Sequence, residues 1–117
     1  MATRLELLTG FLEFFASPAD QQVEHLRRKG MQPDAFLLEF VVAFEDLAAG
    51  ALDLLAEGEL DARQMYSVKK LGDWLRELRG EQDPGLWTED ALRSAWQWEN
   101  AREMAQDCLL AFRSDAR

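Results

Sequence analysis

Residues 31 to 61 contain no lysine and no arginine, although the same segment carries eight carboxylates. The formal net charge of the chain is −9, and the segments on either side are close to neutral. A concentrated negative surface on a small domain favours a basic partner, because opposed electric fields steer the encounter and disfavour wrong partners. The acids are Asp34, Glu39, Glu45, Asp46, Asp53, Glu57, Glu59 and Asp61.

The sequence also has little cysteine, no signal-peptide pattern and no long apolar run. Cys108 is the only cysteine, which excludes an internal disulfide and a cysteine-pair metal site and is consistent with a reducing compartment. The opening residues, MATRLELL, have an acid inside their apolar stretch and do not form a signal-peptide pattern. No run approaches the roughly 20 apolar residues of a membrane-spanning helix. We therefore expect a cytoplasmic protein with no membrane partner.

Strand-like alternation is absent and only three prolines occur, whereas apolar residues recur at spacings of three and four. The 117 residues, 48% of them hydrophobic, suffice for one core but not for two independent ones. The sequence therefore predicts an all-α fold in which residues 1–117 form a single compact bundle of about five helices. The expected helices are 3–15, 18–29, a long central helix near residues 34–56, 62–79 and 88–112.

Several residues indicate where these helices begin and end. Ser17 followed by Pro18 is typical of a helix start, and Gly30 of a helix end. Asp61 is expected to cap the fourth helix. Thr88 is expected to cap the last one, with Trp87 beside it in a hydrophobic staple.

The long central helix also carries the acids. On a helical wheel of about 100° per residue, four of them fall within about 40° of one another, away from the apolar stripe. These four, named here the acidic ridge, are the candidate partner-binding residues Glu39, Asp46, Asp53 and Glu57. Gly50 sits inside this predicted helix and marks either a close helix crossing or a tolerated glycine.

The sequence offers no residue constellation for catalysis or metal binding. His25 is the only histidine and stands in a charged stretch typical of a solvated helix face. The acidic run at 57–61 lacks the ligand pattern of a helix–loop–helix calcium site. Cys108 lies on the apolar stripe of the last helix, as an inert core thiol would. We expect no enzyme activity, no metal and no cofactor.

Tryptophan is frequent, with four residues in the chain, and Trp96 is the one whose place is ambiguous. Trp98 belongs to the inward stripe of the last helix, whereas Trp96 lies roughly 160° away on the wheel. It either covers the Pro–Gly loop at 81–87 or remains exposed as a partner-binding anchor.

Nucleic acid is not expected as a ligand. The only basic cluster, at residues 27–29, is short and is explained by the end of a helix. The excess of acids also repels phosphates.

Three features together characterise the chain. It is expected to be a compact acidic helical domain, and it has an aromatic-rich opening, FLEFF, from Phe11 to Phe15. Near its end stand Leu86-Trp87-Thr88, followed by Ala91, Leu92 and Trp96. In these features it resembles the small acidic all-helical immunity proteins that bacteria make beside a toxin. The resemblance implies stoichiometric inhibition of a cognate toxin, often by covering its basic active cleft. It transfers no functional residue to this chain.

Two other functions fit the same composition. One is an adaptor or a structural protein that forms a homodimer, in which the acids only keep the domain in solution. The other is a DNA mimic whose carboxylates imitate phosphates and block a nucleic-acid-binding protein. The first expectation remains a protein-binding module for a basic protein partner, a toxin being one candidate.

Overall fold

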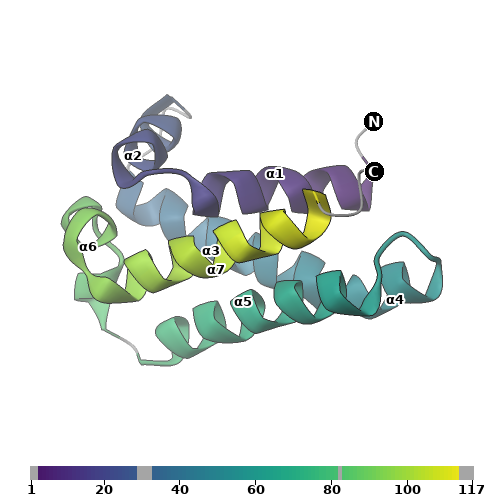
Figure 1. Cartoon of the computed structure of the whole chain (residues 1–117). Coiled ribbons are helices and arrows are strands. Elements are labelled where there is room, and N and C mark those ends of the chain that lie inside the picture. The colour runs from purple at the N-terminus through teal and green to yellow at the C-terminus, as the bar shows by residue number, and fades with distance from the viewer. Residues whose placement is uncertain (1–2, 29–32, 82, 114–117) are drawn as a thin grey trace.

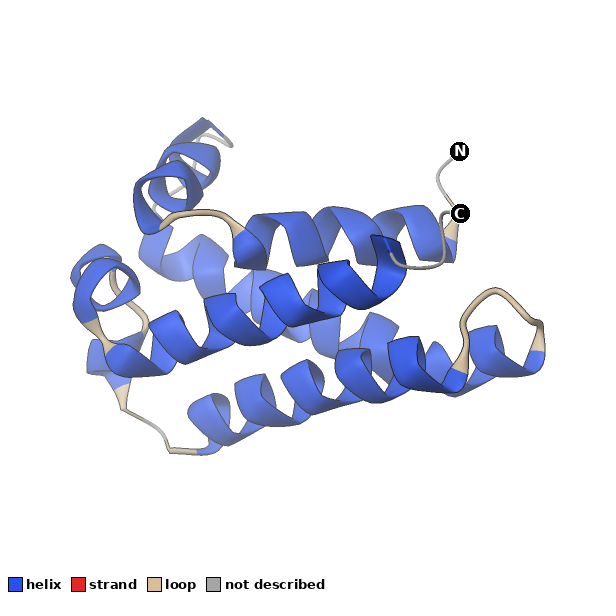
Figure 2. Cartoon of the chain, in the orientation of Figure 1, coloured by secondary structure: helices blue, strands red, loops and turns tan. Residues whose placement is uncertain are grey.

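The protein is described by a computed structural model covering residues 3–28, 33–81 and 83–113. Within these ranges the chain forms seven α-helices and one 3₁₀-helix, with no strand (Figure 2). The prediction of an all-α fold is confirmed. The elements are α1 (Arg4–Ala16), α2 (Ala19–Arg28), α3 (Pro33–Ala49), α4 (Ala51–Ala56), α5 (Ala62–Gly80), η1 (Pro84–Leu86), α6 (Glu89–Ser94) and α7 (Trp96–Arg113).

Four long helices build the body of the molecule. α3 packs against α1 and α5, and α7 packs against the same two helices from the other side. The four therefore form a ring in chain order, with neighbours antiparallel, as in an up-down-up-down helix bundle (Figure 1). The short helices α2 and α6 pack together at one end of this bundle, and α4 extends α3 at the other.

Phenylalanine rings join α1 to α3. The centroids of Phe11 and Phe40 lie 5.3 Å apart, and those of Phe15 and Phe44 lie 5.4 Å apart, both pairs edge to face. This geometry adds about 0.5–1.5 kcal/mol per pair to the free energy gained by burying the rings. Phe44 is fully buried, so its helix is fixed in rotation about its own axis.

Two helix starts follow the expected chemistry, whereas the one predicted at Ser17 and Pro18 does not. α2 begins at Ala19, and the Ser17 hydroxyl donates to the Glu13 carbonyl oxygen at the end of α1, at 2.6 Å. The side chain of Asp61 accepts a hydrogen bond from the Gln64 backbone N–H, and the Gln64 side chain accepts one from the Asp61 backbone N–H, which completes a capping box. Thr88 accepts from the backbone N–H of Ala91. The caps predicted at Asp61 and Thr88 are confirmed, while the predicted helix end at Gly30 lies outside the described residues.

A buried glutamine closes the carboxyl end of α1. Gln22 of α2 donates from Nε2 to the carbonyl oxygens of Phe14 and Phe15, at 3.0 and 3.1 Å. Its Oε1 accepts from Nη1 of Arg102 on α7, at 3.1 Å. The end of α1 is thus tied to two other helices through one side chain whose polar atoms are satisfied.

The predicted continuous helix over residues 34–56 is wrong at one point, because it is divided at Gly50. The backbone N–H of Gly50 donates to the carbonyl oxygen of Leu47 at 3.1 Å. This hydrogen bond joins residues three apart instead of four, and α3 ends here. Ala51 and Leu54 of α4 remain buried, so the apolar stripe continues across the break. Periodicity alone therefore did not reveal the interruption, although glycine is a common place for a helix to bend.

The predicted last helix over residues 88–112 is also divided, at Ala95. Ala95 has extended backbone angles (φ −77°, ψ 134°), so α6 ends there and α7 begins at Trp96. Ion pairs direct α6 toward α2: Glu89 pairs with Arg27 at 2.9 Å, and Arg93 with Asp20 at 3.2 Å. These long-range contacts are not visible in the local sequence pattern.

Gly72 marks a close approach of α5 to α3. A Cβ placed on Gly72 would lie 3.1 Å from the Cβ of Ala48. Replacing Gly72 with leucine should therefore force the two helices apart and lower the free energy of unfolding by about 1–3 kcal/mol. Urea unfolding followed by circular dichroism measures this difference.

Gly10 of α1 provides the matched control, because a Cβ there meets nothing within 4 Å. Gly10→Leu should leave stability unchanged or raise it, since leucine has the higher helix propensity. An equal loss of stability in both variants would contradict a tight contact at Gly72.

Candidate functional site

All four residues of the acidic ridge are exposed, but they do not lie on one helix. Glu39 and Asp46 belong to α3, Asp53 belongs to α4, and Glu57 caps the carboxyl end of α4. The break at Gly50 therefore separates the ridge into two halves on consecutive helices. Its members share the outer side of the α3–α4 segment, because the buried stripe of both helices faces the bundle.

The ridge acids differ in their surroundings. Asp53 lies 3.8 Å from Arg4 of α1, with both side chains at least half exposed, so this pair contributes little to stability. Among the described residues, no ion pair engages Glu39, Asp46 or Glu57. Most of the ridge charge is therefore left to face solvent.

Glu45 has a different role from its neighbour Asp46. Its two carboxylate oxygens accept hydrogen bonds from Nε and Nη2 of Arg79 on α5, at 2.9 and 2.8 Å. Arg76 lies 3.9 Å from the same carboxylate, and the Glu45 side chain is only 9% exposed. The hydrogen bonds and charge of Glu45 raise the pKa of Arg79. This bidentate pair clamps α3 to α5.

Apolar side chains lie exposed next to the ridge, and the sequence prediction did not include them. Leu38 and Val42 of α3 are 41% and 39% exposed, and Leu52 of α4 is 64% exposed. The helical spacing puts Val42 roughly 40° from Asp46, on the side toward α5. The sequence did contain a signal for the exposure of Leu38 and Val42, since neither falls on the inward apolar stripe of the helix.

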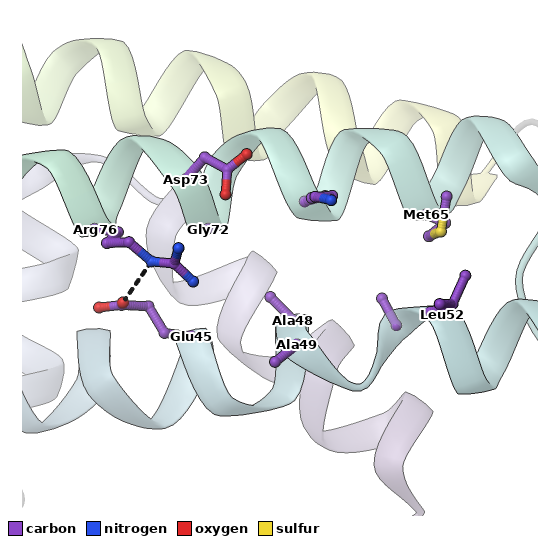
Figure 3. A pocket seen from close by; sticks show the side chains of 10 residues that line it. Glu45, Ala48, Ala49, Leu52, Met65, Gly72, Asp73 and Arg76 are labelled. Atoms are coloured by element: carbon purple, nitrogen blue, oxygen red, sulfur yellow. Dashed lines mark ion pairs between the residues drawn. The ribbon is translucent and has the colours of Figure 1, made fainter.

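A pocket of about 370 Å³ opens between the α3–α4 segment and α5. The small residues Ala48, Ala49, Ala51 and Gly72 line it between its two ends, and Gly72 lies close to Ala48. Figure 3 shows the Glu45–Arg76 ion pair at one end of the pocket and the Leu52 and Met65 side chains facing each other at the other end. One end is therefore charged and the other apolar.

Asp73 and Lys69 of α5 complete the lining of this pocket. Within the described part of the chain, Asp73 takes part in no ion pair, whereas Glu45 is already engaged by Arg79. Asp73 is thus the carboxylate at the pocket that remains open to an incoming cation.

Trp96 lies away from the acidic ridge. It is 62% exposed at the start of α7, and its ring rests 5.7 Å from that of Trp74 on α5. The Pro–Gly loop is held instead by Trp98, whose Nε1 donates to the carbonyl of Leu86 at 2.7 Å, and by Trp87 against it. Because α7 stands diagonally across the ring from α3, the structure does not bring Trp96 together with the ridge.

The residues considered for chemistry are separate from one another. His25 stands against the rings of Phe14 and Phe40, at 5.3 and 5.6 Å. Cys108 is fully buried in the core, and burial raises the pKa of its thiol from 9.0 to about 12. In the described ranges, no group of three histidine, cysteine or acidic side chains is placed to share a metal ion.

Comparison of the chain with models of known protein families, with curated proteins and with solved structures gives no match. A search of the described residues for a helix long and apolar enough to cross a lipid bilayer also finds none. The exposed acids and apolar side chains make the outer surface of α3 and α4, with the pocket beside it, the candidate site.

Replacing Glu45 with alanine should lower the free energy of unfolding by about 1–2 kcal/mol, because two charged hydrogen bonds are lost. Solvent screening at the 44% exposed Arg79 keeps the loss at the lower end of this range. Asp46→Ala is the control on the adjacent residue and should change stability by less than about 0.5 kcal/mol. Chemical denaturation of the two variants compares them, and equal losses would contradict the clamp.

Cys108 should resist thiol reagents in the folded protein and react at once after unfolding. Its raised pKa also links stability to pH. The thiol loses its proton near pH 9 in the unfolded chain and near pH 12 in the folded protein. The contribution of the buried, protonated thiol to the free energy of unfolding is therefore complete below pH 9 and is lost as the pH rises toward 12. The difference in free energy of unfolding between wild type and Cys108→Ala, measured by denaturation, should therefore shrink as the pH rises between these values. A constant difference would contradict the shift.

Proposed function

We propose that this protein is a binding module for a basic protein surface, and that the acidic ridge guides the association. The observation that carries the proposal is the exposure of Glu39, Asp46 and Glu57, which have no ion pair among the described residues, on the outside of one helical segment. A negative surface of this kind accelerates the encounter with a positive one and loses this effect as salt is added.

The adjacent apolar side chains support a binding role for the same surface. Charge gives speed and selectivity of encounter, whereas the lifetime of a complex depends on desolvated contacts. Leu38, Val42 and Leu52 lie next to the ridge acids and provide apolar area for such contacts. Exposed apolar side chains that gather on one surface beside charged residues are typical of an interaction site.

The biological role that we propose is that of an immunity protein, which inhibits a basic bacterial toxin by covering its active surface. A rigid helical bundle suits this task, because a partner surface can be matched without ordering a flexible chain. A single buried thiol also suits the cytoplasm, where such an inhibitor would protect the cell that makes the toxin.

The proposal is tested by affinity capture from the native host with the wild-type protein and with a triple variant, Glu39→Lys, Asp46→Lys and Glu57→Lys. Asp53 is left in place because it pairs with Arg4. A basic partner should be retained by the wild type, and its association rate with the variant should fall at least about tenfold at low salt. Stopped-flow or surface-based kinetics with the purified partner measures this rate.

In the matched control, three exposed acids elsewhere on the protein are replaced with lysine, which gives the same change in net charge. They are Glu13, Glu103 and Asp107. This variant should keep most of the wild-type rate, because its substitutions lie on α1 and α7. Equal slowing in both variants would point to net charge alone and contradict a role for the ridge. Capture of a nucleic-acid-binding protein that DNA displaces would instead support the DNA-mimic function.

A further inference from the structure

We propose that the pocket between α3–α4 and α5 is the seat of one amphipathic α-helix of the partner, with an apolar stripe and a basic flank. This inference builds on the proposed function, since it names the part of the partner that the surface receives. The groove in question is the pocket together with the surface of α3 beyond its charged Glu45 end, where Leu38 and Val42 are exposed.

The groove has the length and shape of a site for a helix. From Leu38 to Ala49 it follows α3 for about 16 Å, which matches about 11 residues of a partner helix, and Leu52 extends it beyond the break at Gly50. Two antiparallel helices form its walls, and Ala48, Ala49 and Gly72 form a floor without large side chains. A third helix can approach such a floor closely, at the usual interaxial distance of about 8–10 Å.

An extended segment is a poorer occupant than a helix. Strand-like binding gains most of its affinity from main-chain hydrogen bonds to an exposed sheet edge. The walls of this groove are helices, whose backbone N–H and C=O groups are bonded to one another. A partner helix also satisfies its own backbone, so only side chains need to match the groove.

Charge around the groove defines which helix fits. The ridge acids Glu39, Asp46 and Asp53 lie on the outer side of its α3–α4 wall. On the α5 side, Asp73 is accompanied by the cations Lys69 and Arg76, so the excess of negative charge that a basic flank meets is on the α3–α4 side. Apolar side chains of the occupant fit between Leu52 and Met65, while lysine or arginine on its flank meets the ridge. A second copy of this chain fits less well, because it would bring another net charge of −9 to the same surface.

The experiment uses the full-length protein and a synthetic helical peptide of about 14 residues, in which leucines lie on one face and lysines on the other. Two control peptides have either the same composition in scrambled order or glutamate in place of lysine. Binding is followed by ¹³C-methyl NMR of the methionines, because Met65 lines the groove and Met104 lies on α7. The amphipathic basic peptide should shift the Met65 methyl signal and leave that of Met104 in place.

Two variants test whether the groove itself is occupied. Ala49→Trp fills the pocket from an exposed position and should weaken peptide binding at least about tenfold. Leu52→Ala removes one apolar wall and should weaken binding without loss of fold. Gln21→Trp adds the same side chain on α2, outside the groove, and should bind as the wild type does.

The outcomes separate this inference from the proposed function. Peptide binding that survives Ala49→Trp, shifts Met104, or is equal for the scrambled peptide overturns the groove assignment. The same holds if the protein alone forms dimers in sedimentation experiments that Ala49→Trp abolishes, because the groove is then filled by a second copy. Loss of partner capture in the ridge variant alone, with Ala49→Trp unaffected, would retain the acidic binding surface and reject the helix in the groove.

Discussion

Burial of the inward face of α3 between α1 and α5 is the constraint on which the rest of the structure depends. Phe44 packs against rings of α1, and Ala48 lies close to Gly72 of α5. With these contacts made, α3 cannot rotate about its axis without exposing phenylalanine or creating a clash. The direction in which its acids point is a consequence of this packing and not of their own interactions.

Within this frame, neighbouring carboxylates acquire different roles. Glu45 is turned toward α5 and becomes a structural partner of Arg79, whereas Asp46, about 100° further around the helix, faces outward. Asp61 caps a helix, and Asp53 lies near Arg4. The acidic segment is thus divided into residues that hold the bundle together and residues that give the surface its field.

The surface that results combines two properties that a binding site needs. The charge of the ridge acts over about a Debye length and does not require a defined geometry. The groove beside it acts at contact and requires a partner of the right shape. Both belong to the same helical segment, so the partner that we propose, once attracted by the acids, would meet the groove next to them. Trp96, by contrast, forms a separate aromatic contact with Trp74 on the far side of the ring.

The sequence by itself determined the helical class, the approximate helix positions, the caps at Asp61 and Thr88, and the concentration of acids on one segment. These features depend on residues close together in the chain, where periodicity and capping chemistry act. Only the tertiary structure decided the breaks at Gly50 and Ala95, the engagement of Glu45 by Arg79, the position of Trp96 and the existence of the groove. The Glu45–Arg79 pair, the Trp96–Trp74 contact and the pocket each depend on helices far apart in sequence, and no local pattern encodes which helix faces will meet.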